Sequence, residues 1–175
     1  MPSESFDRLD PLPDEEWSPQ LRSVLEQLSP ILNVHRVIAH HPDLMAAWTP
    51  LRQHITTKGS LDPRSRELVI LRVAHRSGVA YEWHHHVARA RTAGLREEEI
   101  ESVRSALNAG WPADEAALLN AVDDLFDDLT LETSTRESLA AHYSTQEILD
   151  LIFTVGVYVT LAMLINSARI EIEDA

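Results

Sequence analysis

The sequence predicts an all-α protein, a single domain of about eight helices. Apolar side chains recur at spacings of three and four residues along most of the chain, which is the period of an amphipathic helix. No segment alternates apolar and polar residues for long enough to indicate a sheet, and proline and glycine fall where helices would start and stop. With 175 residues, the chain is long enough for one well-filled core and short for two.

The first third of the chain predicts an arm followed by three helices. Residues 1–17 carry three prolines among several acidic residues, so we expect an extended N-terminal arm, lying on a neighbouring subunit, with the helical domain at 18–175. Ser18 and Pro19 predict a helix start, and Pro30 ends that helix after Leu28. Two more helices are predicted at 34–39 and from His41-Pro42 to about Thr57, the second with a kink at Pro50.

The rest of the chain predicts five or six further helices. Asp62-Pro63 is the clearest start signal and Gly78 the matching stop, and the helix after Gly78 ends at Gly94. Further helices are predicted at 97–107, 114–129 and 134–143, with Leu129 pointing inward and the aspartates of 114–129 forming a solvated face. Ser144 and Glu147 form a capping-box pattern ahead of a long apolar helix to about Ala168.

Net charge and cysteine content exclude several classes of binding partner and chemistry. The formal net charge is −13, and no stretch gathers basic residues with aromatics, so we expect neither nucleic acid nor an anionic membrane as a partner. An anionic substrate would need a local cation. The absence of cysteine excludes disulfides, thiolate catalysis and cysteine metal ligands within the chain. We also see no signal-peptide pattern, and no apolar run as long as a membrane helix, which predicts a cytoplasmic location.

Two titratable residues stand on apolar helical faces. At 100° per residue, Glu67 falls within about 60° of Ile70 and Ala74, and His86 falls inside the apolar arc of the next helix. Glu67 lies eleven residues before Gly78 and His86 eight after it, so an antiparallel hairpin places them about 4 to 5 Å apart along the axis. Burying such groups unpaired costs several kcal/mol each, which indicates a proton-handling pair.

Other interpretations of these residues stay open at this stage. Glu82 and His86 at i,i+4 could be no more than a helix-stabilising pair. Glu67, Glu82 and His86 could form a two-carboxylate, one-histidine metal site, although we predict none. Three successive histidines, 84–86, cannot close on one ion because their side chains diverge by 100°.

The hairpin resembles the carboxymuconolactone decarboxylase family, which includes the alkyl hydroperoxidase D proteins. The resemblance covers roughly residues 34–168 and rests on Asp62-Pro63-Arg64-x-Arg66-Glu67-Leu68, Tyr81-Glu82-Trp83-x-x-His86 and Ala90-x-x-x-Gly94-Leu95, with Gly156-x-Tyr158 in the last core helix. It implies the alkyl hydroperoxidase D-like helical fold with a central helical hairpin. In the family's hydroperoxidase branch, cysteines stand where this chain has Val79 and Glu82, so thiol peroxidase activity is not expected.

The resemblance implies acid/base chemistry without a cofactor. We expect a carbon–carbon lyase, decarboxylase or isomerase that acts by proton transfer on a small unsaturated lactone or keto acid. Glu67, Glu82 and His86 would be catalytic, and Tyr81 and Arg64 would bind substrate, although a surface role for Arg64 fits the sequence equally well. The alternatives are a non-catalytic small-molecule-binding or assembly member, or a peroxidase-fold homologue without redox cysteines.

The long apolar helix near the end of the sequence indicates that copies of the chain associate. The segment from Ile148 to Ile165 is apolar nearly all round, which demands burial on every side. Members of the family form trimers or hexamers, and we expect a homo-oligomer here.

Overall fold

The computed structural model describes residues 8–105 and 110–173, and these residues form nine α-helices and no strand. The all-α prediction is therefore confirmed. The chain divides into two compact units, Ile55–Ala162 and the pair of segments Met1–His54 and Met163–Ala175. The assignment of 18–175 to one domain after an arm stays a prediction.

The N-terminal unit holds three helices that the sequence located: α1 (Pro19–Leu25), α2 (Asn33–Ile38) and α3 (Pro42–Gln53). The Ser18 hydroxyl accepts a hydrogen bond from the Leu21 N–H at 3.2 Å, so the predicted cap is present. Helix α3 continues through Pro50 to Gln53, and a π-helical turn follows at His54–Lys58.

The described part of the predicted arm packs on its own chain. The Leu9 N–H donates to the Ala168 carbonyl at 3.1 Å, and the Leu12 N–H donates to the Arg36 carbonyl at 3.2 Å. A short 3₁₀ turn at Asp14–Glu16 then leads to Trp17, whose ring is contacted by the guanidinium groups of Arg22 and Arg36, 5.2 and 4.8 Å from its centroid. These contacts hold the arm against α2 and the end of α9 rather than extending it away. Residues 1–7 of the arm lie outside the described part.

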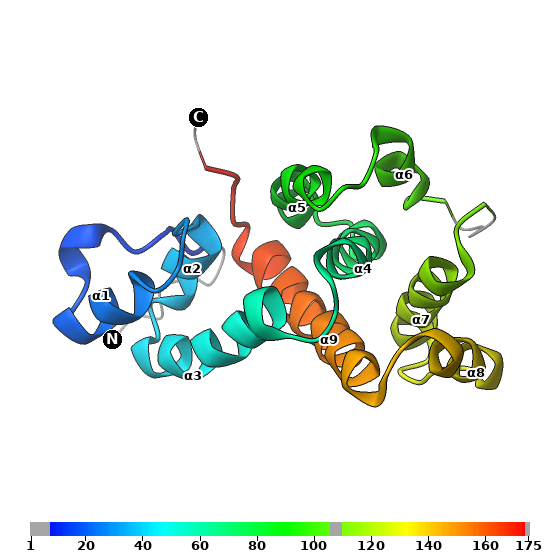
Figure 1. Ribbon diagram of the computed structural model, residues 1–175. Helices are drawn as coiled ribbons and strands as arrows, with labels where there is room; N and C mark the ends of the chain where they lie inside the picture. The colour runs from blue at the N-terminus through cyan, green and yellow to red at the C-terminus, as the bar shows by residue number, and fades with distance from the viewer. Residues whose placement is uncertain (1–7, 106–109, 174–175) are drawn as a thin grey trace. The chain divides into compact units, whose positions relative to one another are not determined.

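The second unit is built around α4 (Pro63–Arg76), which packs against α5 (Ala80–Thr92) on one side and α7 (Ala113–Asp127) on the other (Figure 1). The Asp62 carboxylate caps α4 by accepting from the N–H groups of Arg64 and Ser65 at 2.9 and 3.1 Å. Gly78 ends the helix with a φ of 64°, a conformation that glycine adopts without strain. Helix α4 is thus buried on both faces, and only the face toward α5 was expected from the sequence.

The second buried face of α4 carries an arginine whose burial the sequence did not indicate. The Arg72 side chain is fully buried, and its Nε and Nη2 bind both carboxylate oxygens of Asp123 on α7 at 2.9 and 2.5 Å. Its Nη1 donates to the carbonyls of Val103 and Ser105, each at 2.5 Å. Asp123 therefore belongs to a buried ion pair, and the prediction of a wholly solvated aspartate face was wrong at this residue.

The remaining helices are α6 (Glu97–Ser102), α8 (Thr133–His142) and α9 (Thr145–Ala168). Helix α6 ends before the predicted residue 107, which lies outside the described residues. The inward prediction for Leu129 was wrong, because α7 ends at Asp127 and Leu129 has a φ of 56° with 88% of its surface exposed. The capping box of α9 is confirmed: the Ser144 N–H donates to Glu147 at 2.7 Å, and the Glu147 N–H donates to the Ser144 hydroxyl at 3.3 Å.

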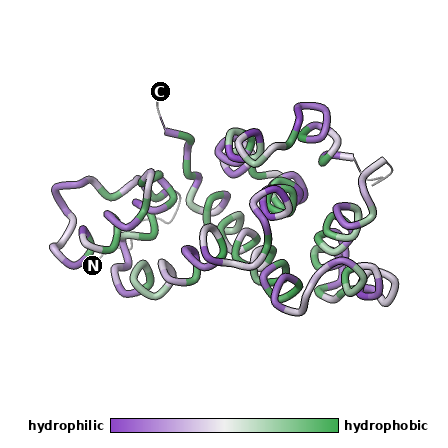
Figure 2. Tube along the Cα trace, in the orientation of Figure 1, coloured by the Kyte–Doolittle hydropathy of each residue, from purple (hydrophilic) through white to green (hydrophobic). Residues whose placement is uncertain are grey.

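Helix α9 is hydrophobic over most of its length (Figure 2). Its 24 residues are long and apolar enough to cross a bilayer by length and composition alone, and 39% of its most apolar window is buried. Core helices of soluble proteins meet the same criteria. Three of its large apolar side chains, Leu149, Phe153 and Met163, are more than half exposed.

Candidate active site

The α4–α5 hairpin brings Glu67 and His86 together as the sequence predicted. Both side chains are buried, and His86 Nδ1 lies 2.6 Å from Glu67 Oε2. The two residues meet because the tight turn at Gly78 makes α4 and α5 antiparallel. Residues at similar distances from the turn, one on each helix, therefore lie side by side. The predicted pairing of these two residues is thus confirmed, while their catalytic roles stay a prediction.

Glu82 completes a trio on the opposite edge of the imidazole. Its Oε2 lies 3.4 Å from His86 Nε2, one helical turn away on α5. The exposed fractions of the Glu67, Glu82 and His86 side chains are 4%, 7% and 2%, so all three are nearly sealed from solvent. A histidine held between two buried carboxylates has one acidic neighbour at each ring nitrogen.

Two neighbours of His86 were not assigned roles from the sequence. Arg89 Nη1 lies 3.1 Å from His86 Nε2, one turn further along α5. The Tyr158 ring of α9 meets the imidazole edge to face, with centroids 5.1 Å apart. The i,i+3 spacing from His86 could have indicated Arg89, and Tyr158 lies in the motif that carried the family resemblance.

The hydrogen bonds fit a neutral imidazole. A guanidinium can only donate, so the bond from Arg89 requires an unprotonated Nε2 and leaves the ring proton on Nδ1, where it is donated to Glu67. In the protonated ring, Nε2–H would instead point at Glu82, whose carboxylate is 3.4 Å away. Arg89 therefore binds Nε2 when the ring is neutral, and Glu82 binds it when the ring is protonated.

Electrostatics favour the charged pair. Burial is the largest single influence on His86 and lowers its pKa, but the hydrogen bonds and charges of Glu67 and Glu82 together raise the pKa above 6.5. Burial likewise raises the pKa of Glu67, and His86, with help from Arg66 and Arg89, lowers that pKa below 4.5. The geometry fits the neutral ring while the two carboxylates favour the charged one, so the surroundings of the imidazole support both protonation states that acid/base chemistry uses.

The two predicted substrate-binding residues lie in different surroundings. Tyr81 is buried on α5 and packs edge to face on His85, with centroids 4.6 Å apart. The Arg64 guanidinium binds Glu115 at 2.6 Å, Glu99 at 2.9 Å and the Gly94 carbonyl at 2.8 Å. Its hydrogen bond is the largest of the effects that lower the pKa of Glu99 to about 2. These contacts are those of a structural cation that joins α4 to α6 and α7.

No group of three histidine or carboxylate side chains within residues 8–105 and 110–173 is placed to hold a metal ion. The trio fails because Glu67 and Glu82 face different ring nitrogens, so a single ion could not replace both contacts.

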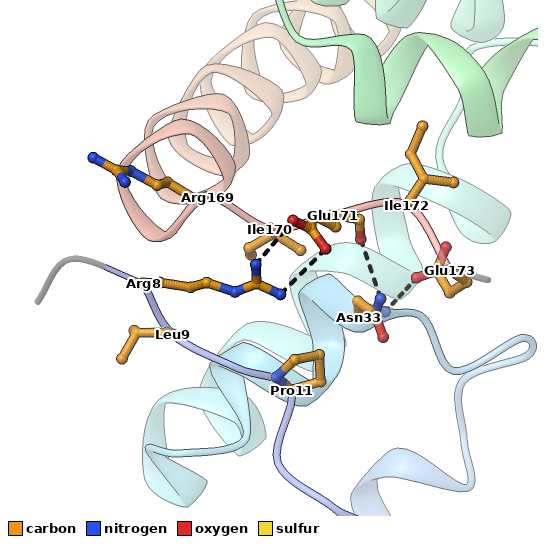
Figure 3. Close-up of a pocket in the computed structure, with 9 residues that line it drawn as sticks. All are labelled: Arg8, Leu9, Pro11, Asn33, Arg169, Ile170, Glu171, Ile172 and Glu173. Atoms are coloured by element: carbon orange, nitrogen blue, oxygen red, sulfur yellow. Dashed lines mark hydrogen bonds and ion pairs between the residues drawn. The ribbon is translucent and has the colours of Figure 1, made fainter.

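A pocket of about 320 Å³ lies in the N-terminal unit. Figure 3 shows Arg8 reaching the Glu171 carboxylate, and Asn33 binding the Glu171 carbonyl and the Glu173 side chain. The Arg8 bond joins the N-terminal arm to the segment after α9, and the Asn33 bonds join the start of α2 to the same segment. None of Arg64, Glu67, Tyr81, Glu82 and His86 lines this pocket.

Comparisons with known proteins agree with the hairpin's sequence and with the fold. The sequence model described as the carboxymuconolactone decarboxylase family matches residues 42–124, which include the whole α4–α5 hairpin. A comparison with curated protein sequences finds no significant match.

Several solved structures share the fold at low sequence identity. The debrominase Bmp8, solved as a variant in complex with 2,3,4-tribromopyrrole, is 17% identical with a TM-score of 0.79, over 94% of this chain and 91% of that one. A putative antioxidant defence protein from Agrobacterium tumefaciens, of unknown function, is 23% identical with a TM-score of 0.70, and the match covers 79% of this chain and 96% of that one. A peroxidase-related protein from Ralstonia eutropha with an alkylhydroperoxidase core is 19% identical with a TM-score of 0.75, and the match covers 93% of this chain and 87% of that one.

The expected fold is confirmed by these likenesses. The three hairpin motifs that suggested the family lie inside the matched segment, and Gly156-x-Tyr158 lies outside it. The chain is thus a cysteine-free protein with an alkyl hydroperoxidase D-like fold, and its residues 42–124 match the sequence model of the carboxymuconolactone decarboxylase family.

Proposed function

We propose that the chain is a proton-transfer enzyme, a decarboxylase-like lyase or an isomerase that acts on a small unsaturated lactone or keto acid. The observation that carries the proposal is the buried imidazole of His86 between the carboxylates of Glu67 and Glu82. In a cysteine-free chain, this trio keeps the acid/base part of the family site and none of its thiol chemistry.

In the proposed mechanism, Nε2 of His86 is the atom that exchanges a proton with the substrate. Glu67 holds Nδ1–H at 2.6 Å, which fixes the ring and leaves Nε2 as its reactive edge. In a decarboxylation, the carboxylated lactone loses carbon dioxide, and the imidazolium Nε2–H donates its proton to carbon of the resulting dienolate. In an isomerisation, neutral Nε2 takes a proton from the carbon beside a carbonyl and returns it to another carbon. Glu82 would stabilise the imidazolium in both reactions.

The likeness to the debrominase is consistent with this substrate class. That protein was solved with 2,3,4-tribromopyrrole, a small unsaturated ring. We propose a ligand of similar size and unsaturation, bearing oxygen functions in place of halogen.

A second candidate is a non-catalytic member that binds a small molecule or serves assembly. The observation that favours it is the near-complete burial of the trio, since a catalytic site must admit its substrate. We further propose a homo-oligomer, supported by the exposed side chains of Leu149 and Phe153 on α9.

Turnover separates the two candidates. Purified protein is screened for carbon dioxide release and double-bond migration with unsaturated lactones and keto acids, alongside His86→Ala, Glu67→Gln and the control His84→Ala. His84 is an exposed histidine of the same helix, so its loss leaves turnover unchanged. The proposal expects both trio variants to abolish turnover while the helical circular dichroism is kept. Turnover that survives in both variants would overturn it, and binding without turnover would favour the second candidate.

A further inference from the structure

The cations of the second unit differ in how fully their charge is neutralised. Arg64 binds two carboxylates, and Arg72 and Arg76 share Asp123. Arg91 pairs with Glu97. These arginines are held by carboxylates, so their charge is already balanced within the protein.

Arg89 is different. Within the part of the chain that the structure describes, its guanidinium forms no ion pair with a carboxylate, and its hydrogen bond goes to the uncharged ring nitrogen of His86 at 3.1 Å. Its side chain is half-buried, whereas His86 and Glu82 beyond it are buried. Within the described residues, Arg89 therefore carries a half-buried positive charge that no carboxylate pairs directly, and this charge acts on Glu67 only at longer range, where it lowers the pKa of that carboxyl.

An anionic ligand needs such a charge. The chain carries a formal net charge of −13, and the trio itself holds two carboxylates, so a ligand acid group is repelled unless a cation meets it. A guanidinium binds a carboxylate through two parallel N–H donors, which is a stronger arrangement than its single bond to an imidazole nitrogen.

Moving Arg89 to a ligand would change His86. The groups that face the ring are Glu67, with Arg66 beside it, from α4, Glu82 and Arg89 from α5, and Tyr158 from α9. If the guanidinium leaves Nε2, that nitrogen loses a donor and a positive neighbour and keeps Glu82 at 3.4 Å. Protonation of Nε2 then becomes more favourable.

We propose that Arg89 binds the acid group of a small carboxylate ligand and couples that binding to protonation of His86. The inference rests on the proposed function, because it names the ligand-binding and positioning residue of the same site. It assigns to Arg89 the recognition role that the sequence suggested for Arg64.

The test uses the full chain and sorbate, a small unsaturated carboxylate, with its neutral ethyl ester for comparison. Calorimetric titration of the Arg89→Ala variant is expected to show sorbate binding weakened at least tenfold relative to wild type, and an ester affinity that does not change. Arg89→Lys keeps the charge and recovers part of the sorbate affinity. Arg91→Ala removes the same charge from the same helix away from His86, and binds sorbate as wild type does.

Nuclear magnetic resonance of the His86 ring supplies a second readout. Saturating sorbate is expected to raise the pKa of His86 in wild type and to leave it unchanged in Arg89→Ala. Three results would overturn the inference: no saturable sorbate binding to wild type, an Arg89→Ala affinity within twofold of wild type, or equal losses in Arg89→Ala and Arg91→Ala. Sorbate binding that depends on Arg89, in a protein without turnover on any substrate of the class, would overturn the proposed function and keep this inference.

Discussion

Replacing Glu67 by glutamine removes the charge of the buried pair while keeping the shape of the side chain. Glu67 and His86 are 4% and 2% exposed, and their atoms Oε2 and Nδ1 are 2.6 Å apart. In wild type at a pH where His86 is protonated, this is a charge-assisted bond in the interior. In the variant, a neutral amide faces the imidazolium, and Glu82 at 3.4 Å is the remaining buried carboxylate beside it.

The expected loss is about 3 kcal/mol of unfolding free energy. Removing one partner of a buried ion pair costs about 3–5 kcal/mol, and the lower end applies because the amide oxygen still accepts a hydrogen bond and Glu82 still offsets part of the charge. When His86 is neutral, only a hydrogen bond to a charged acceptor is lost, about 1.5–3 kcal/mol. The loss is therefore larger at the lower pH.

The pH of the measurement follows from the directions of the two pKa shifts. The folded pKa of His86 is raised above 6.5, so the stabilisation from protonating it is complete below 6.5 and is lost as the pH rises through the raised value. The folded pKa of Glu67 is lowered below 4.5, so its contribution is complete above 4.5 and is lost as the pH falls through the lowered value. The ion pair therefore contributes its full stabilisation between pH 4.5 and pH 6.5.

Urea unfolding followed by circular dichroism at about pH 5.5 and about pH 9 measures the effect. The control is Glu97→Gln, which breaks a pair with Arg91 whose side chains are 65% and 54% exposed, and this variant should unfold as wild type does. A Glu67→Gln loss below about 1 kcal/mol at the lower pH would refute the assignment of a buried ion pair.

Three further predictions test other parts of the structure. Arg72→Met should lower the unfolding free energy by about 3 kcal/mol in urea titrations, because Asp123 loses a buried bidentate partner; a change below about 1 kcal/mol would contradict the buried network. Phe153→Asp should shift the chain to a smaller species in light scattering if α9 forms the oligomer interface, and an unchanged mass would contradict that role. Val79→Cys combined with Glu82→Cys places two buried thiols three residues apart at the start of α5, and mild oxidation should join them in a disulfide detected by mass spectrometry; two thiols that stay reduced would contradict the alignment with the hydroperoxidase frame.

The hairpin was predictable because its signals are local. Asp62 and Gly78 mark the ends of α4 through side-chain capping and positive φ, which depend on a few neighbouring residues. The meeting of Glu67 with His86 then followed from helix geometry and the short turn. The capping box at Ser144 is local in the same way.

The features that the sequence did not reveal depend on distant partners. The burial of Arg72 was not predicted, because its partner Asp123 lies 51 positions away, on a helix whose packing side the local pattern did not fix. Arg64 looked available to a substrate because Glu99 and Glu115 meet it only once α6 and α7 are in place. Leu129 continued the apolar period of α7 past the end of the helix.

In the proposed mechanism, His86 is held between two buried carboxylates that raise the pKa of its ring. Titration of the His86 ring by nuclear magnetic resonance of ¹⁵N-labelled protein measures this most directly. We predict a pKa above 6.5 in wild type, a neutral form that keeps its proton on Nδ1, and a lower pKa in Glu67→Gln. A ring that titrates at or below 6.5, or whose pKa is the same in wild type and Glu67→Gln, would contradict the account.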